Sequence, residues 1–284
     1  MNSCIAVLIT VYNRKDKTLA CLSDVYSLSR SEGDVIDVFL VDGGSSDGTP
    51  HAIAEAFPDV KVEVCDGLYW AGGMRRAWND ALATGKHYSH FLLVNDDTRL
   101  YSGALSSLSH AESSFPGGIY VGATKDPLTG ACSYGGHRLL MPGHEKSSMC
   151  LPDGKLHEVD LGNANIMLVS RGAYERLGVL CDAYTHGIAD YDYTLSAVKA
   201  GIPVVLAADY CGECRDDHGN SWVAQNSSLR ERIKYLYSPK GLAYKEYMFY
   251  VRKFFPKDAL IIWVKLWLKT ICPFLWDIKS SLHG

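Results

Sequence analysis

Carboxylates follow two apolar runs in the N-terminal half of the chain. Asn95-Asp96-Asp97 comes directly after Phe91–Val94, and Asp42 ends the run Val35–Val41. Hard oxygen ligands at strand ends suit Mg²⁺ or Mn²⁺, which complete their shells with water and substrate phosphates. Asp96 and Asp97 alone would equally suit a turn that caps a helix. Carboxylates at two neighbouring strand ends, however, repel each other unless a cation or hydrogen-bond donors intervene, so the pattern favours a divalent-cation site.

A glycine-rich loop follows Asp42. Its sequence, Gly43-Gly44-Ser45-Ser46-Asp47-Gly48-Thr49, lets bare backbone approach a ligand and offers Ser or Asp as a helix cap. It contains no Gly-Lys-Ser/Thr, and no Gly-x-Gly-x-x-Gly follows the first apolar run. The signatures of P-loop ATPases and of classical dinucleotide-binding proteins are therefore missing.

Two glycines begin a further predicted helix. Gly72 and Gly73 open it, so that its N-terminus would face a diphosphate, and Arg75 or Arg76 would add positive charge. The alternative is that the tryptophans around them are core residues and the arginines are solvated.

The elements that must position these residues alternate along the chain. Apolar, β-branched runs bounded by turn residues predict strands at 4–11, 35–41, 60–64, 90–94 and 119–122. Helix-period segments between them indicate an α/β fold with a mainly parallel central sheet. Beyond residue 124 the chain is glycine-rich and turn-rich, with strands predicted at 165–170 and 202–207 and a helix near 188–200. Ligands of open α/β sheets bind outside the carboxyl ends of the strands, where the polar segments lie.

Four segments, in this order and spacing, resemble the family 2 inverting glycosyltransferases with the GT-A fold. They are Thr-Val-Tyr-Asn-Arg (10–14), Asp-Gly-Gly-Ser-Ser-Asp-Gly-Thr (42–49), Tyr-Trp-Ala-Gly-Gly-Met-Arg-Arg-Ala-Trp-Asn (69–79) and Leu-Val-Asn-Asp-Asp-Thr (93–98). The resemblance covers roughly residues 4–220 and points to the bacterial polysaccharide and rhamnosyltransferase-like members.

The resemblance also implies roles for individual residues. Those on the side of the nucleotide-diphosphate donor would be Thr10, Tyr12, Arg14, Asp42, Gly72, Arg75, Asn95 and Asp96. Thr10, Tyr12 and Asp42 would hold the base and ribose, and uracil or thymine is favoured as the base. Asp97 would be the chief metal ligand of the "DxD" motif. Asn95 replaces the first acid of that motif by an amide, which leaves the number of protein–metal bonds open.

Inverting transfer needs one base to take a proton from the acceptor hydroxyl. Similarity to the family's Glu-Asp motif favours Asp190 as the catalytic base, with Ala189 in place of the glutamate. Asp192, two residues later, should point to another helical face and is placed on the acceptor side. N-terminal capping of the helix is the alternative for both aspartates. Gly162 and Asn163 resemble the family's glycine loop between donor and acceptor, although Gly162 could simply start a strand.

His218 resembles the C-terminal histidine that joins the DxD aspartate on the metal in many GT-A enzymes. Cys211, Cys214 and His218 also look like part of a zinc site. Structural zinc sites need four ligands, and no second Cys/His pair lies at a suitable spacing, so reduced, partly buried cysteines are favoured.

The C-terminal region is basic and aromatic. Residues 229–284 carry 11 Lys and Arg against 4 Asp and Glu, about +7, which leaves about −11 on residues 1–228. An apolar stripe is predicted along one helical face, with lysines on another: Leu260, Trp263, Val264, Trp267, Leu268 and Ile271. Membrane-surface binding to anionic lipids is slightly favoured over packing on the catalytic domain or on a second copy in a homodimer.

The length and composition of the chain indicate the general class of protein. The chain has 284 residues, 47% hydrophobic and 21% charged, which is ordinary globular usage. An acidic body argues against nucleic-acid binding. Nine cysteines and no visible signal peptide favour reduced thiols in the cytoplasm, with peripheral binding to the inner face of the membrane.

These observations predict a catalytic domain over residues 1–228 and a basic amphipathic helical extension over 229–284. The predicted activity is inverting transfer, with Mg²⁺ or Mn²⁺, from a UDP- or dTDP-linked sugar to a hydroxyl of a saccharide or lipid-linked acceptor. A sugar-1-phosphate nucleotidyltransferase is one alternative, although the basic glycine-rich loop expected after its first strand is missing. A sugar- or nucleotide-binding module without catalysis is the other, to which Ala189 and Asn95 lend weight.

Overall fold

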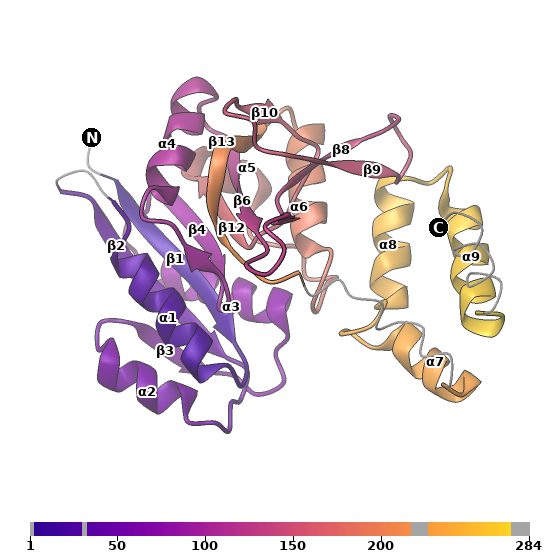
Figure 1. The fold of residues 1–284 in the computed structure, drawn as a ribbon, viewed down its shortest axis with the longest axis horizontal. Helices are drawn as coiled ribbons and strands as arrows, with labels where there is room; N and C mark the ends of the chain where they lie inside the picture. The colour runs from indigo at the N-terminus through magenta and orange to yellow at the C-terminus, as the bar shows by residue number, and fades with distance from the viewer. Residues whose placement is uncertain (1–2, 30–32, 217–226, 274–284) are drawn as a thin grey trace.

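The computed structural model describes residues 3–29, 33–216 and 227–273. Its centre is a ten-stranded sheet in which the strands of the main path follow the order β10-β13-β6-β12-β4-β1-β2-β3 (Figure 1). The strand bounds are β1 (Cys4–Val11), β2 (Val35–Asp42), β3 (Lys61–Val64), β4 (His90–Asn95), β5 (Arg99–Leu100), β6 (Ile119–Lys125), β7 (Cys132–Tyr134), β10 (His157–Glu158), β12 (Ile166–Ser170) and β13 (Val204–Glu213). The predicted α/β class is confirmed.

The strands that lead to the carboxylates are parallel. β1 lies between β2 and β4 and pairs in parallel with both, and β2 pairs in parallel with β3. In this register Thr10 is opposite both Val41 and Asn95, which brings the ends of the three strands to one edge. β12 runs antiparallel between β4 and β6, so the sheet is mainly but not wholly parallel.

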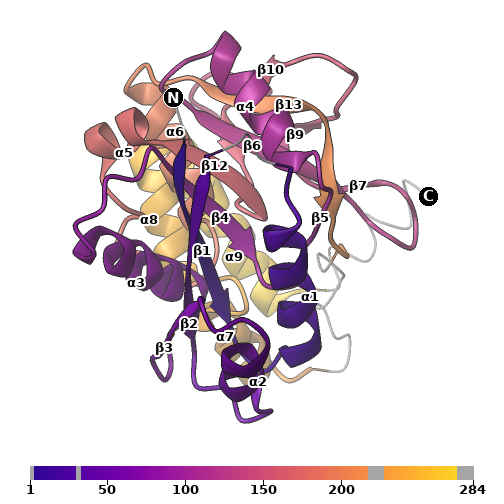
Figure 2. The ribbon, with the colours of Figure 1, turned by 90° about the vertical axis from the view of Figure 1, so that its left-hand side faces the viewer.

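Helices cover both faces of the sheet. Their bounds are α1 (Lys15–Tyr26), α2 (Thr49–Ala56), α3 (Trp70–Ala83), α4 (Ala104–Ser114), α5 (Arg171–Leu177), α6 (Ala189–Lys199), α7 (Leu229–Tyr237), α8 (Tyr244–Phe254) and α9 (Ala259–Ile271). Alternate residues of the strands enter two cores, one with α1, α2 and α4 and the other with α3, α5, α6 and α8. Figure 2 shows α1 and α3 on opposite sides of β1 and β4.

The glycine-rich middle of the chain is more regular than its sequence predicts. It forms a small three-stranded antiparallel sheet of β8 (Gly136–Leu139), β9 (Ser147–Cys150) and β11 (Leu161–Gly162). β13 also continues six residues beyond the predicted end at Ala207, to Glu213. It pairs with β6 through irregularities in register, which a period-two pattern does not reveal.

The three C-terminal helices lie together on the side of the molecule away from α1 and α2 (Figure 1). α7 begins at Leu229, where Ser228 and Glu231 form a capping box. α8 packs into the main core through Met248, Val251 and Phe254. Among the described helices, none combines the length and the apolar character needed to cross a membrane.

Candidate active site

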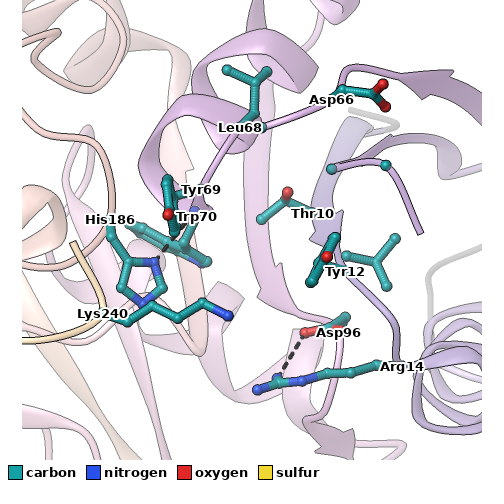
Figure 3. Close-up of a pocket in the computed structure, with 14 residues that line it drawn as sticks. Thr10, Tyr12, Arg14, Asp66, Leu68, Tyr69, Trp70, Asp96, His186 and Lys240 are labelled. Atoms are coloured by element: carbon teal, nitrogen blue, oxygen red, sulfur yellow. Dashed lines mark hydrogen bonds and ion pairs between the residues drawn. The ribbon is translucent and has the colours of Figure 1, made fainter. Parts of the chain in front are cut away.

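A cavity of about 530 Å³ lies at the carboxyl edge of β1 and β2 (Figure 3). Five stretches supply its walls: the end of β1, the loop after β2, the segment before α3, the turn after β4, and two positions late in the chain. The side chains labelled in Figure 3 are Thr10, Tyr12, Arg14, Asp66, Leu68, Tyr69, Trp70, Asp96, His186 and Lys240. Its size is typical of a small-molecule site.

Asp42 shapes the loop after β2. Its Oδ1 accepts hydrogen bonds from the N–H groups of Gly44 (2.8 Å) and Ser45 (2.6 Å), and the residue is fully buried. Gly44 adopts a φ of +95°, a conformation that glycine tolerates, and this lets the loop turn beside the cavity. Gly43 and Gly44 themselves line the cavity. Asp42 therefore supports the wall from behind it.

Thr10 and Tyr12 project from the end of β1 into the cavity. The Thr10 hydroxyl donates to the carbonyl of Val41 at 3.2 Å. Gly73 of α3 packs so closely on the Thr10 side chain that a Cβ there would collide with it. The Tyr12 ring is 51% exposed and lies open to the cavity.

Arg14 joins the two carboxylates after β4. Its Nη1 lies 2.7 Å from Asp97 Oδ2 and 3.2 Å from Asp96 Oδ1. Burial raises the pKa of Asp96 to about 7, and the Asp97 charge adds to this rise while Arg14 opposes it. The guanidinium thus supplies positive charge between two carboxylates that would otherwise repel each other.

The residues present fit a divalent cation. Asp96 Oδ2 is buried and has no hydrogen-bond partner in the described part of the chain. Two carboxylates together with substrate phosphates and water are a sufficient donor set for Mg²⁺ or Mn²⁺. No group of three His, Cys, Asp or Glu side chains over residues 3–29, 33–216 and 227–273 is arranged as a complete metal centre. The predicted ligand His218 lies outside the described residues.

The side chain of Asn95 is hydrogen-bonded to a neighbouring side chain. Its Oδ1 accepts a hydrogen bond from Trp70 Nε1 at 2.7 Å. The Trp70 backbone N–H donates to Nδ1 of His186 at 3.4 Å. Asn95 therefore fixes the Trp70 indole in the cavity wall.

Gly72 and Arg75, near the N-terminus of α3, contact a later segment of the chain. The Gly72 N–H faces the carbonyl of Thr185 at 3.4 Å, and Gly72 does not line the cavity. Arg75 Nη1 donates at 2.8 Å to the carbonyls of both Cys181 and Tyr184, and Arg75 does not line the cavity either. Gly72 and Arg75 thus bind carbonyls of the segment 181–186.

Asp190 lies at the first residues of α6, beside the loop before β12. Its Oδ2 accepts from the Ala164 N–H at 3.2 Å, and its Oδ1 from its neighbour Tyr191 N–H at 2.9 Å. Burial raises the pKa of this carboxyl, and the hydrogen bonds from Ala164, Tyr191 and Asn163 partly offset the rise. A raised pKa suits a proton acceptor.

Asp192 does not share this position. It is only 2% exposed, and both its oxygens lie 2.8 Å from Lys253 Nζ of α8. The Tyr184 hydroxyl donates to its Oδ2 at 2.7 Å. The prediction that Asp192 lies on the acceptor side is corrected. Asp192 forms an interior ion pair with Lys253 of α8, a contact that the sequence alone does not reveal. Its direction away from Asp190 agrees with the helical geometry.

Gly162 and Asn163 have different roles: Gly162 serves packing, and Asn163 belongs to the site. Gly162 is the last residue of β11, and a Cβ there would meet Val121 at 2.5 Å, so its smallness serves packing. Asn163 Nδ2 donates to the Tyr191 hydroxyl at 3.4 Å, and its side chain also lowers the pKa of Asp190. Asn163 therefore lies beside the candidate base.

Cys211 lies within β13, and Cys214 directly follows the last residue of this strand. Cys211 is in the core with α1, α2 and α4, and burial raises the pKa of its thiol to about 12. The Cys214 sulfur lies 3.8 Å from Asp97 Oδ1.

Several cavity residues are not among the predicted site residues, and two of them, His186 and Lys240, come from the second half of the chain. Both follow the predicted donor motifs by more than 85 residues. His186 lies four residues before the candidate base Asp190, and no motif surrounds Lys240, so the tertiary structure is what assigns both to the cavity.

Comparisons with known proteins agree with this architecture. Residues 6–119 match the model of glycosyl transferase family 2. No curated protein matches the chain by sequence. Among solved structures, similar ones include the mannosyltransferase PcManGT from Pyrobaculum calidifontis in complex with GDP-Man and Mn²⁺ (TM-score 0.53, 16% identity, covering 82% of this chain and 61% of that one).

A second similar structure is TarS residues 1–349 of S. aureus in complex with UDP-GlcNAc. It has a TM-score of 0.55 and 12% identity, and the match covers 82% of this chain and 64% of that one. The chain thus spans somewhat less than two thirds of either relative, and at these identities the likeness concerns the fold. Residues 6–119 therefore match glycosyl transferase family 2, and the chain has the GT-A fold of these solved structures.

Proposed function

We propose that this chain is an inverting glycosyltransferase that moves a sugar from a nucleoside diphosphate to a hydroxyl of a saccharide or lipid-linked acceptor. One observation carries the proposal: Asp96 lines the cavity, and the residue before it, Asn95, binds the same short loop before β12 that also holds Asp190. The similar structures solved with GDP-Man and UDP-GlcNAc support the class of donor.

The loop 163–165 connects the two acidic centres. The Asn165 carbonyl accepts from the Asn95 N–H at 3.2 Å, next to Asp96. One residue earlier, the Ala164 N–H donates to Asp190 at 3.2 Å. A donor held over Asp96 and an acceptor over Asp190 would therefore meet beside this loop.

The chemistry follows from these positions. The acceptor hydroxyl gives its proton to the Asp190 carboxylate while its oxygen forms a bond to the anomeric carbon. The bond from that carbon to the diphosphate oxygen breaks on the opposite side, and the nucleoside diphosphate leaves with the electron pair. The anomeric configuration is inverted. Asp96 and Asp97 would hold the divalent cation, which would neutralise negative charge on the leaving diphosphate.

A thermal-shift screen tests the proposal with UDP-, dTDP- and GDP-sugars, each with and without Mn²⁺. A matching donor should stabilise the chain by RT ln(1 + [L]/Kd), about 2.7 kcal/mol at 100 Kd. The stabilised combination should then release nucleoside diphosphate in the presence of acceptor. Stabilisation without turnover would indicate a binding module. Pyrophosphate release from a nucleoside triphosphate and a sugar 1-phosphate would indicate a nucleotidyltransferase.

We further propose that α9 rests on an anionic membrane surface. The buried side of α9 contains Ile262 and Thr270, whereas much of the predicted apolar stripe is exposed. The exposed apolar residues of the helix, from 72% for Leu260 to 38% for Val264, are Leu260, Ile261, Trp263, Val264, Leu268 and Ile271. Lys265 lies among them and would meet lipid headgroups. Aromatic and apolar side chains beside lysines are typical of an interfacial helix.

Flotation with vesicles of about 30% anionic lipid tests this surface. The double variant Leu260→Glu/Leu268→Glu should lose most of its binding, because two charges enter the apolar face. Leu128→Glu is the matched control, since Leu128 is 74% exposed on the loop between β6 and β7, outside α9. If the double variant floats as the control does but loses self-association on gel filtration, the face joins two copies instead.

A further inference from the structure

A tight turn between α7 and α8 holds Lys240 in place. Pro239 follows the end of α7, and the Gly241 and Ala243 N–H groups both donate to the Ser238 carbonyl, at 2.9 and 3.1 Å. Gly241 packs against the Tyr235 backbone so closely that no Cβ fits. The turn therefore has few alternative conformations, and Lys240 occupies its tip.

From this tip Lys240 reaches the cavity. It is one of the lining residues, and its Nζ lies 5.5 Å from the centre of the Tyr12 ring. In Figure 3 its side chain enters beside His186 and extends toward the Tyr12 side of the cavity. In the described part of the chain no carboxylate is within ion-pair distance of Lys240, whereas Arg14 is paired with Asp96 and Asp97.

His186 adds a neutral hydrogen-bond donor next to this ammonium. Because its Nδ1 accepts from the Trp70 N–H, the ring proton is assigned to Nε2. Burial lowers the pKa of His186, and the charges of Lys240 and Arg14 lower it further while Glu246 opposes them. The imidazole is therefore neutral at pH 7 and can donate from Nε2.

Contacts to α8 hold both residues against the catalytic domain. Glu246 accepts from the Thr185 hydroxyl at 2.5 Å and from its N–H at 3.0 Å. Thr185 directly precedes His186, and its carbonyl accepts a hydrogen bond from the Gly72 N–H of α3. The segment that contains His186 is therefore bound to both α3 and α8. The segment between α7 and α8 is thus part of the cavity wall.

We propose that Lys240 binds the diphosphate of the donor, so that the C-terminal extension completes the donor site. The inference rests on the proposed function and adds a residue to it. An ammonium that has no carboxylate partner among the described residues, over an aromatic ring in a nucleotide-sized cavity, suits a polyanion. With Arg14 and Lys17 both paired to the carboxylates of Asp96 and Asp97, Lys240 supplies the further positive charge that a diphosphate requires.

Calorimetric titration of the full-length chain tests the role of Lys240. The ligands are UDP, dTDP and GDP, each compared with its nucleoside. Lys240→Gln should weaken binding of the matching diphosphate about tenfold and leave nucleoside binding unchanged. Lys240→Arg should bind nearly as the unaltered chain does. The loss should shrink at about 0.5 M salt, since screening weakens an attraction between charges.

Lys245→Gln is the matched control, an identical charge change at an exposed position of α8 that does not line the cavity. Equal binding by Lys240→Gln and Lys245→Gln would overturn the inference. An equal loss for diphosphate and nucleoside would also overturn it, because Lys240 would then act by packing on Tyr12. If the unaltered chain binds none of the three diphosphates, the proposed function itself fails.

Discussion

Replacing Asp190 by asparagine should lower the rate of sugar transfer by about 10²–10⁴-fold, the usual contribution of a positioned general base. The amide has nearly the same shape but cannot accept the proton. Binding of the donor should change little, because Asp190 does not line the cavity. Initial transfer rates and calorimetric donor affinities measure the two effects separately.

The pH dependence supplies a second readout. Burial raises the pKa of Asp190, and the base works only when deprotonated, so kcat/KM should fall as the pH falls through that raised value. The acid limb should therefore lie above the ordinary aspartate pKa of about 3.9. In Asp190→Asn the residual rate should lack this limb.

Asp192→Asn is the matched control, since it lies two residues away and faces Lys253. It should lower the free energy of unfolding by about 1–3 kcal/mol, because it weakens a buried ion pair, and leave the pH profile unchanged. Transfer within tenfold of normal by Asp190→Asn, or a larger loss of turnover in the control, would place the base elsewhere.

Replacing Asp97 by asparagine should reduce transfer by about 10²–10³-fold, a typical cost of losing one electrostatic stabiliser of a leaving group. Asp97 supplies one of the two carboxylates that fit the cation, and burial raises the pKa of the other, Asp96, to about 7. The increase in nucleoside diphosphate affinity that Mn²⁺ causes should also disappear. Calorimetry with and without Mn²⁺ measures that increase directly, without turnover.

Asp59→Asn provides the control, because Asp59 is exposed between α2 and β3 and its loss changes the net charge equally. Persistence of the Mn²⁺-dependent increase in Asp97→Asn would show that other residues hold the cation. Loss of the increase in both variants would show a dependence on overall charge instead.

The local sequence was sufficient to predict which strand ends would carry the residues that line the cavity. Residues 4–11, 35–41 and 90–94 have the apolar pattern of buried parallel strands, and parallel strands bring their carboxyl ends to one edge. Thr10, Tyr12 and Asp96 accordingly line the cavity. The family match over residues 6–119 covers the same region.

The remaining differences arise from contacts between distant segments. Gly72 and Arg75 bind carbonyls more than 100 residues later in the chain, and nothing near them in sequence indicates that these partners exist. Asp192 pairs with Lys253 across 61 residues. For α9, the apolar residues extend around most of the helix, so periodicity alone did not show which side would be buried.

The contacts of α8 and of the segment before α9 have a consequence for exchanging segments between related chains. Glu246 binds Thr185, Lys253 binds Asp192, and Asp258 binds His144 at 2.8 Å, so three separate regions of the catalytic domain depend on residues after 228. An exchange of C-terminal segments between related chains would have to transfer these complementary residues together. Residues 229–273 therefore form one structural unit with the residues that they contact, and exchanging them alone should remove these contacts.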